Sequence, residues 1–229
     1  MFPRFSRFHF FPLALPFFII LFVAVVFLIS AIEIGVVGYA YEKIGINPRY
    51  VFAVLLLSLL GSYINIPVSC LPSRENVSKQ EITVFGVRYV IPTAENRPGT
   101  VVAINLGGAV IPTAVSLYLI VRYRLFLQGF LGIVIVGAVA HAMAKPVRGL
   151  GIAVPVFIPP LAAALTTLLL SSERGPQVAY IAGTLGTLIG ADLLNLGRIQ
   201  GLGAPIVSIG GAGTFDGIFL TGILAVLLA

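Results

Sequence analysis

The sequence predicts an all-α polytopic membrane protein, and three observations indicate this fold class. Hydrophobic residues make up 59% of the 229 residues and charged residues only 10%, whereas a soluble domain carries about 25% charged residues. Apolar stretches recur along the chain, each close to the roughly 20 residues that a helix needs to cross a bilayer. Little sequence remains between these stretches, so we expect a single transmembrane domain over residues 1–229.

About seven transmembrane helices are expected, some of them interrupted by Gly or Pro. The apolar segments cover residues 17–41, 49–68, 101–121, 125–144, 150–170, 177–196 and 205–229. The first segment follows Arg4 and Arg7, as the core of a signal peptide would. We interpret it as a retained span because it exceeds the roughly 7–15 apolar residues of a signal core.

The long connection over residues 69–100 is expected to lie outside the membrane, between spans two and three. Its segment ITVFGVRYVIP is rich in β-branched and aromatic residues and has Gly86 near its middle, which predicts a short β-hairpin at the membrane surface. The net charge of +6 is typical of basic residues that flank spans and meet anionic headgroups. The lipid bilayer is therefore the expected partner, and the sequence has no basic cluster of the nucleic-acid-binding kind.

Two pairs of segments suggest an internal repeat. SLLGSYINIP (58–67) aligns with TLIGADLLNL (187–196), and INLGGAVIPTAV (104–115) aligns with VSIGGAGTFDGI (207–218). The copies would lie four spans apart and point the same way across the bilayer, as parallel repeats do. The two C-terminal aspartates would then belong to the second copy only. The alternative is a chance match between Gly- and Leu-rich membrane segments.

Three acidic residues fall within apolar segments: Glu33, Asp192 and Asp216. A charge at the bilayer centre costs roughly 2.5–3.5 kcal/mol on insertion scales, so such residues are functional candidates. Glu33 either lies at the interface or is buried and paired. Consecutive spans run antiparallel, so we expect Asp192 and Asp216 to meet near a helix break at GGAGTFDG. Otherwise Asp192 reaches interfacial water and Asp216 caps a half-helix.

Gly- and Pro-rich interruptions accompany these acids. Irregular backbone at membrane depth is tolerated only where it faces protein or water, so we expect a substrate or ion pathway there. The residues expected to line it are Asn105, Gly107, Gly108, Pro159, Pro160, Gly210 and Gly211. The alternative is that these residues only allow close helix packing. Asn65 and Asn195 are expected to donate hydrogen bonds between helices.

The acids suggest two functions that use the same residues. In the first, Asp192 and Asp216 are the catalytic pair of an intramembrane aspartyl protease-like hydrolase, sharing one proton and activating a water, with a membrane-embedded peptide as substrate. In the second, they bind the ion of a cation- or proton-coupled transporter. A third interpretation is a non-catalytic assembly protein. No nucleotide-binding loop or zinc-ligand spacing occurs in the sequence, so neither a cofactor nor a resident metal is expected.

Several segments together resemble a known family. They are SLLGSYINIP, AINLGGAVIP, VPVFIPPLAAA, GTLIGADLLNL and SIGGAGTFDGIFLTGILAVLLA. The chain from about residue 55 to 229 is similar to a prokaryotic integral-membrane family catalogued as domain of unknown function 1614, and the last segment is the most specific. The resemblance implies a multi-pass protein of a bacterial or archaeal cytoplasmic membrane. It implies no activity.

Overall fold

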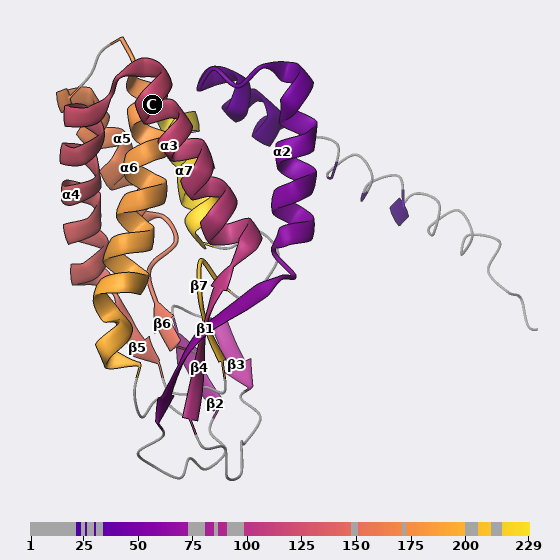
Figure 1. Ribbon diagram of the computed structural model, residues 1–229, viewed down its shortest axis with the longest axis vertical. Helices are drawn as coiled ribbons and strands as arrows, with labels where there is room; N and C mark the ends of the chain where they lie inside the picture. The colour runs from indigo at the N-terminus through magenta and orange to yellow at the C-terminus, as the bar shows by residue number, and fades with distance from the viewer. Residues whose placement is uncertain are drawn as a thin grey trace, which may run out of the picture. The chain divides into compact units, whose positions relative to one another are not determined.

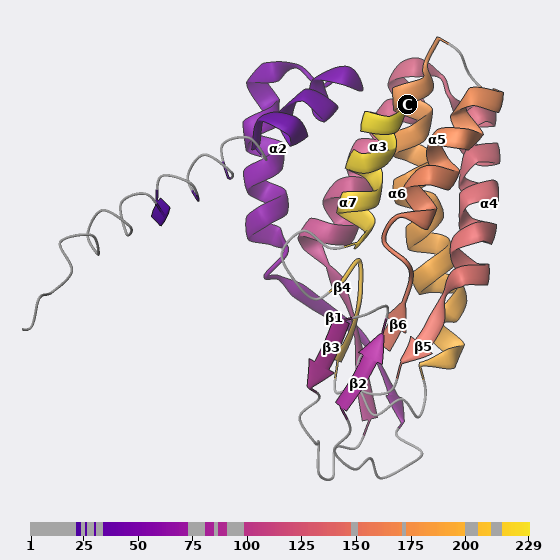
Figure 2. The same cartoon turned by 180° about the vertical axis from the view of Figure 1, so that it is seen from behind.

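The structure, a computed structural model, is mostly helical and contains small β-sheets (Figures 1 and 2). It describes residues 22–23, 26, 30, 34–72, 81–84, 87–90, 99–147, 151–170, 173–199, 206–211 and 217–229. The chain forms two compact units, Met1–Tyr39 and Ala40–Ala229. In the first unit residues 34–39 are helical. Its exposed side chains include Phe22, Val23 and Ile34.

The second unit holds the labelled helices. They are α2 (Pro48–Gly61), α3 (Ile111–Tyr123), α4 (Phe126–Met143), α5 (Ile158–Leu170), α6 (Gly175–Thr187) and α7 (Gly217–Leu228). The π-helix η1 (Leu106–Val110) leads into α3, and α6 continues through the π-helix η2 (Leu188–Asp192) and the 3-10 helix η3 (Leu193–Arg198). Helix α6 contacts α3, α4, α5 and α7, so it is the central helix of the bundle (Figure 1).

Proline residues begin several of these helices. The first turns of α2, α3 and α6 each contain one, where the missing N–H has no partner to lose and the fixed φ suits a helix. Pro159 and Pro160 likewise occupy the first turn of α5, which begins at Ile158. The sequence predicted that these prolines interrupt a span over residues 150–170. In the structure they lie at the start of the helix instead.

The apolar helices make this a multi-pass membrane protein in contact with the lipid bilayer. Among the described residues, three helical segments are long and apolar enough to cross a membrane: Leu106–Tyr123, Phe126–Met143 and Gly175–Arg198. Helices α2, α5 and α7 are shorter and also apolar. Large apolar side chains such as Phe130, Leu168 and Leu169 are exposed on the outside of the bundle, where lipid can cover them.

A mixed three-stranded sheet lies at one end of the helices (Figure 2). Its order is β1 (Asn65–Pro72), β4 (Gly99–Asn105) and β7 (Ile206–Ile209). Strand β4 pairs antiparallel with β1 and parallel with β7. These strands occupy the ends of segments that were expected to be membrane helices, some of them interrupted, namely 49–68, 101–121 and 205–229. No strand was expected in them. A short apolar, β-branched run fits a buried strand as well as a helix, and here strand pairing decides.

Two antiparallel hairpins complete the strands. The pair β2 (Glu81–Val84) and β3 (Val87–Val90) confirms the hairpin expected between spans two and three. A second hairpin, β5 (Lys145–Val147) with β6 (Gly151–Ala153), precedes α5 and was not expected.

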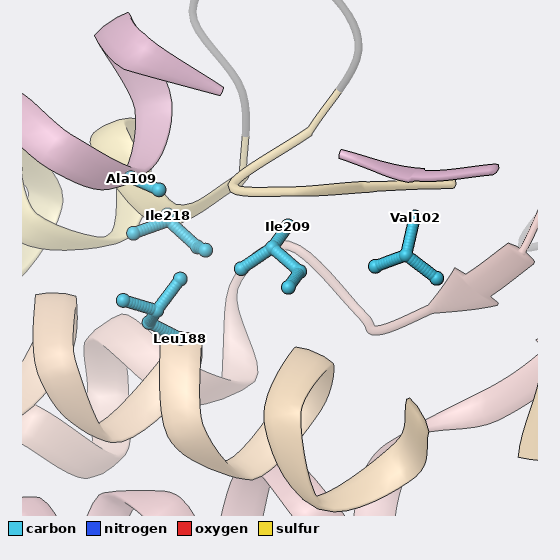
Figure 3. Close-up of a cluster of buried hydrophobic side chains, with 5 residues drawn as sticks. All are labelled: Val102, Ala109, Leu188, Ile209 and Ile218. Carbon is cyan, nitrogen blue, oxygen red and sulfur yellow. The ribbon is translucent and has the colours of Figure 1, made fainter. Parts of the chain in front are cut away.

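A buried apolar cluster joins the sheet to the helices (Figure 3). It consists of Val102, Ala109, Leu188, Ile209 and Ile218. These side chains come from β4, η1, η2, β7 and α7. The cluster therefore fixes the ends of the parallel strands against the irregular part of the central helix, where the predicted site lies.

Candidate functional site

Asn105 links the sheet to two helices. It is the last residue of β4, lies opposite Asn65 of β1 and is 1% exposed. Its Nδ2 donates to the carbonyl oxygen of Ser62 (2.7 Å) and to Oδ1 of Asn65 (3.0 Å). Its Oδ1 accepts the N–H of Gly108 (2.7 Å) and so caps the N-terminus of η1. A buried amide is stable only when its polar atoms are paired in this way.

The hydrogen bonds continue from Asn105 to β7. Oδ1 of Asn65 also accepts from the hydroxyl of Ser208. The side chains of Asn105, Asn65 and Ser208 thus join the three strands of the sheet, and the carbonyl of Ser62 adds the end of α2. We call Asn65, Asn105, Ser208 and Asp192 the polar cluster, because Asp192 accepts a hydrogen bond from the turn that follows Ser208.

Asp192 is the last residue of η2 and is half-buried. Its Oδ2 accepts the N–H of Gly210 at 2.8 Å. Gly210 and Gly211 follow β7 with φ values of +83° and +84°, a conformation that residues with a Cβ adopt only with strain. This turn presents a backbone donor to the carboxylate and brings the irregular end of the α6 segment against the end of β7.

The glycines after Asn105 allow their backbone to approach two neighbours. A Cβ on Gly107 would lie 2.0 Å from the carbonyl oxygen of Ser58, and one on Gly108 would lie 2.0 Å from that of Gly210. Neither distance is sterically permitted, so both positions require glycine. The structure therefore brings together Asn105, Gly107 and Gly108 from one predicted interruption with Gly210 and Asp192 from the other.

The remaining predicted site residues have different positions. Pro159 and Pro160 are buried in α5, and none of the polar contacts described above involves them. Asp216 and Glu33 lie outside the described residues. Asp216 directly precedes Gly217, the first residue of α7.

Asn65 and Asn195 were both predicted to donate hydrogen bonds between helices, and the structure gives each a different role. Asn65 lies in a strand and accepts hydrogen bonds through Oδ1, because the chain leaves the helical conformation before it. Asn195 donates to the carbonyls of Gly190 and Ala191 in its own segment, because the π-helix frees these carbonyls from regular pairing. The sequence did not predict a role for Ser208, whose only signal is that it is the one polar residue of the apolar strand IVSI.

Metal ligands do not gather in the described part of the chain. No group of three or more His, Cys, Asp or Glu residues there could hold a metal ion. Any cation at the polar cluster would be held by a carboxylate together with amide, hydroxyl and backbone oxygens, a set of ligands suited to hard cations.

The fold and cluster define a class: a multi-pass membrane protein whose helices meet a partly buried polar cluster at the end of a small mixed sheet. The family described as "Protein of unknown function (DUF1614)" matches residues 59–228, which contain the whole polar cluster. The chain belongs to this family, as its sequence resemblance indicated. No curated protein and no solved structure matches the chain.

Proposed function

We propose that the polar cluster is the intramembrane ion site of a proton- or cation-coupled transporter, with Asp192 as the binding carboxylate. The observation that carries the proposal is the hydrogen bond from the Gly210 N–H to Asp192 Oδ2. It joins two segments of irregular backbone, η2 and the turn after β7. Carriers place carboxylates and unwound backbone together in this way to bind Na⁺ or H⁺.

The lengths of the short helices support a site within the membrane. Helix α2 has 14 residues and α7 has 12, which corresponds to about 21 Å and 18 Å of rise. The hydrocarbon core is roughly 30 Å thick. If these helices contribute to spans, the sheet residues that continue them lie at hydrocarbon depth. We therefore propose seven spans in a bacterial or archaeal cytoplasmic membrane, with Asn65, Asn105 and Ser208 at that depth.

Exposure of one member supports access to the cluster. Asn65 is exposed although its amide oxygen accepts two hydrogen bonds. An exposed amide beside apolar helices is costly in lipid, so this side of the cluster is better explained by contact with water or a polar ligand. Among the expected lining residues, Gly107 and Gly108 are buried and act through the backbone.

A second function, intramembrane aspartyl hydrolysis, is favoured by a separate observation. Leu188 and Ile218 pack in the same cluster (Figure 3). Leu188 lies four residues before Asp192 and Ile218 two residues after Asp216. The hydrolysis proposal requires that Asp192 and Asp216 meet beside this packing; Asp216 itself lies outside the described residues. Neighbouring carboxyls do not both ionise readily, so such a pair would hold one proton and activate a water against a membrane-embedded peptide.

Reconstitution into liposomes tests both functions. Asp192→Asn and Asp216→Asn are compared with wild type and with Glu173→Gln, since Glu173 is an exposed acid away from the cluster. Transport predicts that flux of H⁺ or Na⁺ is lost in Asp192→Asn and kept in Glu173→Gln. Hydrolysis predicts that wild type cleaves single-span peptides without ion flux and that both aspartate variants are inactive. Flux that persists in Asp192→Asn would exclude the transport proposal.

A further inference from the structure

We propose that the central helix binds a file of internal water molecules that runs from Gln177 at one end to Asp192 at the other. The inference rests on the proposed ion site, because it supplies that site with a route for protons. It concerns buried polar groups that no part of the polar cluster uses.

Side-chain polar atoms without hydrogen-bond partners concentrate along this helix. Within the described residues, the fully buried ones are Tyr41 Oη, Ser58 Oγ, His141 Nδ1, Gln177 Oε1, Thr184 Oγ1, Thr187 Oγ1 and Asn195 Oδ1. Four of the seven belong to α6 and its continuation, and His141 lies on α4. Gln177, Thr184 and Thr187 are spaced by seven and three residues, which places them on one face of the helix.

Three further side chains, Tyr180, Tyr41 and Ser58, extend the file sideways from Thr184. The ring of Tyr180 lies 6.1 Å from that of Tyr41, and the Tyr41 side chain also neighbours Ser58. Tyr180 in turn neighbours Thr184. These side chains are at most 4% exposed. Hydroxyl groups from three segments of the chain thus meet beside the middle of α6.

Buried hydroxyls on three other helices, α3, α5 and α7, are satisfied within their own helix. Ser116 in α3, Thr166 and Thr167 in α5, and Thr221 in α7 each donate to a carbonyl of the preceding turn. This internal bond is the usual way for a helix to satisfy a buried hydroxyl. Thr184 and Thr187 form no such bond within the described residues. The Thr184 hydroxyl has the Tyr180 hydroxyl as a neighbour, and the Thr187 hydroxyl is left for another partner.

The two amide oxygens identify that partner as a donor. Gln177 uses Nε2 to donate to the carbonyls of Ile44 and Lys43, which fixes Oε1 as the atom left over. Asn195 uses Nδ2 on Gly190 and Ala191, and its Oδ1 is left over in the same way. An unpaired buried acceptor costs about 1–3 kcal/mol. Internal water is the usual remedy, since it donates two hydrogen bonds and fits between packed helices.

The file is long enough to matter for transport. Gln177 and Asn195 are 18 residues apart, or about 27 Å along an α-helix, close to the roughly 30 Å of the hydrocarbon core. The segment Gly175–Arg198 is also the most buried of the three long candidate spans. Water bound along it would lie inside the protein, away from lipid, and would end beside Asp192, three residues before Asn195.

Radiolytic footprinting tests the file without relying on transport. Hydroxyl radicals formed from bound water modify adjacent tyrosines, so Tyr41 and Tyr180 are expected to be modified in the wild type despite their burial. The variant Thr184→Val with Thr187→Val removes both hydroxyls at similar volume and is expected to reduce this modification about tenfold, the change given by one lost hydrogen bond of about 1.4 kcal/mol. The variant Thr184→Ser keeps a hydroxyl at this position, so modification of the tyrosines should remain at the wild-type level.

Thr166→Val with Thr167→Val is the matched control, because those hydroxyls already bond to their own helix. It should leave modification of both tyrosines unchanged. Proton flux is measured on the same variants, and the valine pair on α6 is expected to slow it about tenfold. Unmodified Tyr41 and Tyr180 in the wild type would overturn the water file. If the tyrosines are modified and proton flux is unchanged in Asp192→Asn, the water file is supported and the proposed ion site is refuted.

Discussion

At the scale of single residues, Asn105 is a central structural side chain of the sheet. Its one amide holds the end of α2, the start of β1 and the N-terminus of η1. The sequence pointed to it as an uncharged polar group near an interruption. The sequence did not reveal that Asn105 ends a strand. Two of its partners, Ser62 and Asn65, are distant in sequence, and the third is the backbone N–H of Gly108.

Replacing Asn105 with alanine should lower the free energy of unfolding by about 2–4 kcal/mol, because a buried N–H and a carbonyl lose their partners. Thermal unfolding in detergent measures the change. Asn47→Ala is the control: its side chain caps α2 at an exposed position, where the expected loss is about 1 kcal/mol. Equal shifts in the two variants would show that the Asn105 bonds do not support the fold.

The hydroxyls of the water file illustrate the limit of prediction at this scale. Thr184 and Thr166 are equally buried threonines in apolar helices, yet only Thr166 donates to its own helix. Threonine in a helix divides between two χ1 rotamers, of which one makes the internal bond. Packing by neighbouring helices selects the rotamer, and a single sequence does not contain that information.

At the scale of elements, hydropathy predicted the positions of the apolar helices well, but it did not predict where each helix begins and ends. The segments expected to span contain α2 to α7, but several include strands. The run GTVVAIN of β4 looks like the start of a helix because a membrane environment removes the polar alternation that identifies a strand. Only pairing with β1 and β7, distant in sequence, makes it one.

The parallel pairing of β4 and β7 bears on the expected repeat. Each strand is followed by two nearby glycines and then by a helix, which is consistent with parallel copies. The register is offset, since the sheet pairs Ile104 with Ile209 whereas the alignment pairs Ile104 with Val207. Duplication stays a prediction.

The contact of α4 with α6 and its continuation η2 can be tested by substitution of glycines. A Cβ on Gly190 would lie 2.1 Å from the carbonyl oxygen of Gly137, whereas the nearest neighbours of one on Gly129 would be the side chains of Ile181, at 3.4 Å, and Ile120, at 3.5 Å. Gly190→Ala should therefore destabilise the bundle by roughly 2–4 kcal/mol, by the overpacking that it forces. Gly129→Ala should be neutral or stabilising by up to about 1 kcal/mol, because alanine favours a helix. Melting temperatures of both variants in one detergent provide the comparison.

At the scale of the whole second unit, strands gather at one end of the bundle and short turns at the other (Figures 1 and 2). Helix α2 leads into β1, and η1 with α3 returns from β4 to the opposite end. This arrangement follows from alternating crossings, which hydropathy predicts well. The polar cluster could be predicted only in part, since its members Asn65 and Ser208 are ordinary residues until the sheet brings them together.

Cysteine labelling tests this topology. Cys70 is exposed in β1 and is the only cysteine of the chain. A membrane-impermeant maleimide should reach it from one side of sealed vesicles. In the variant Cys70→Ser with Arg124→Cys, the thiol lies in the turn after α3 and should react from the other side. Labelling of both positions from the same side would contradict a membrane crossing by α3.

The parallel neighbours in the sheet have a consequence for biosynthesis. Val101 and its partner Ile206 are separated by 105 residues, which take roughly 5–20 s to translate at about 5–20 residues per second. During that interval β1 can already pair with β4, while the far edge of β4 waits with open hydrogen-bonding groups, a hazard for aggregation. The Gly210 donor for Asp192 arrives with the same late strand. A nascent chain halted in this interval would already contain most of its helices, but its polar cluster would still be incomplete.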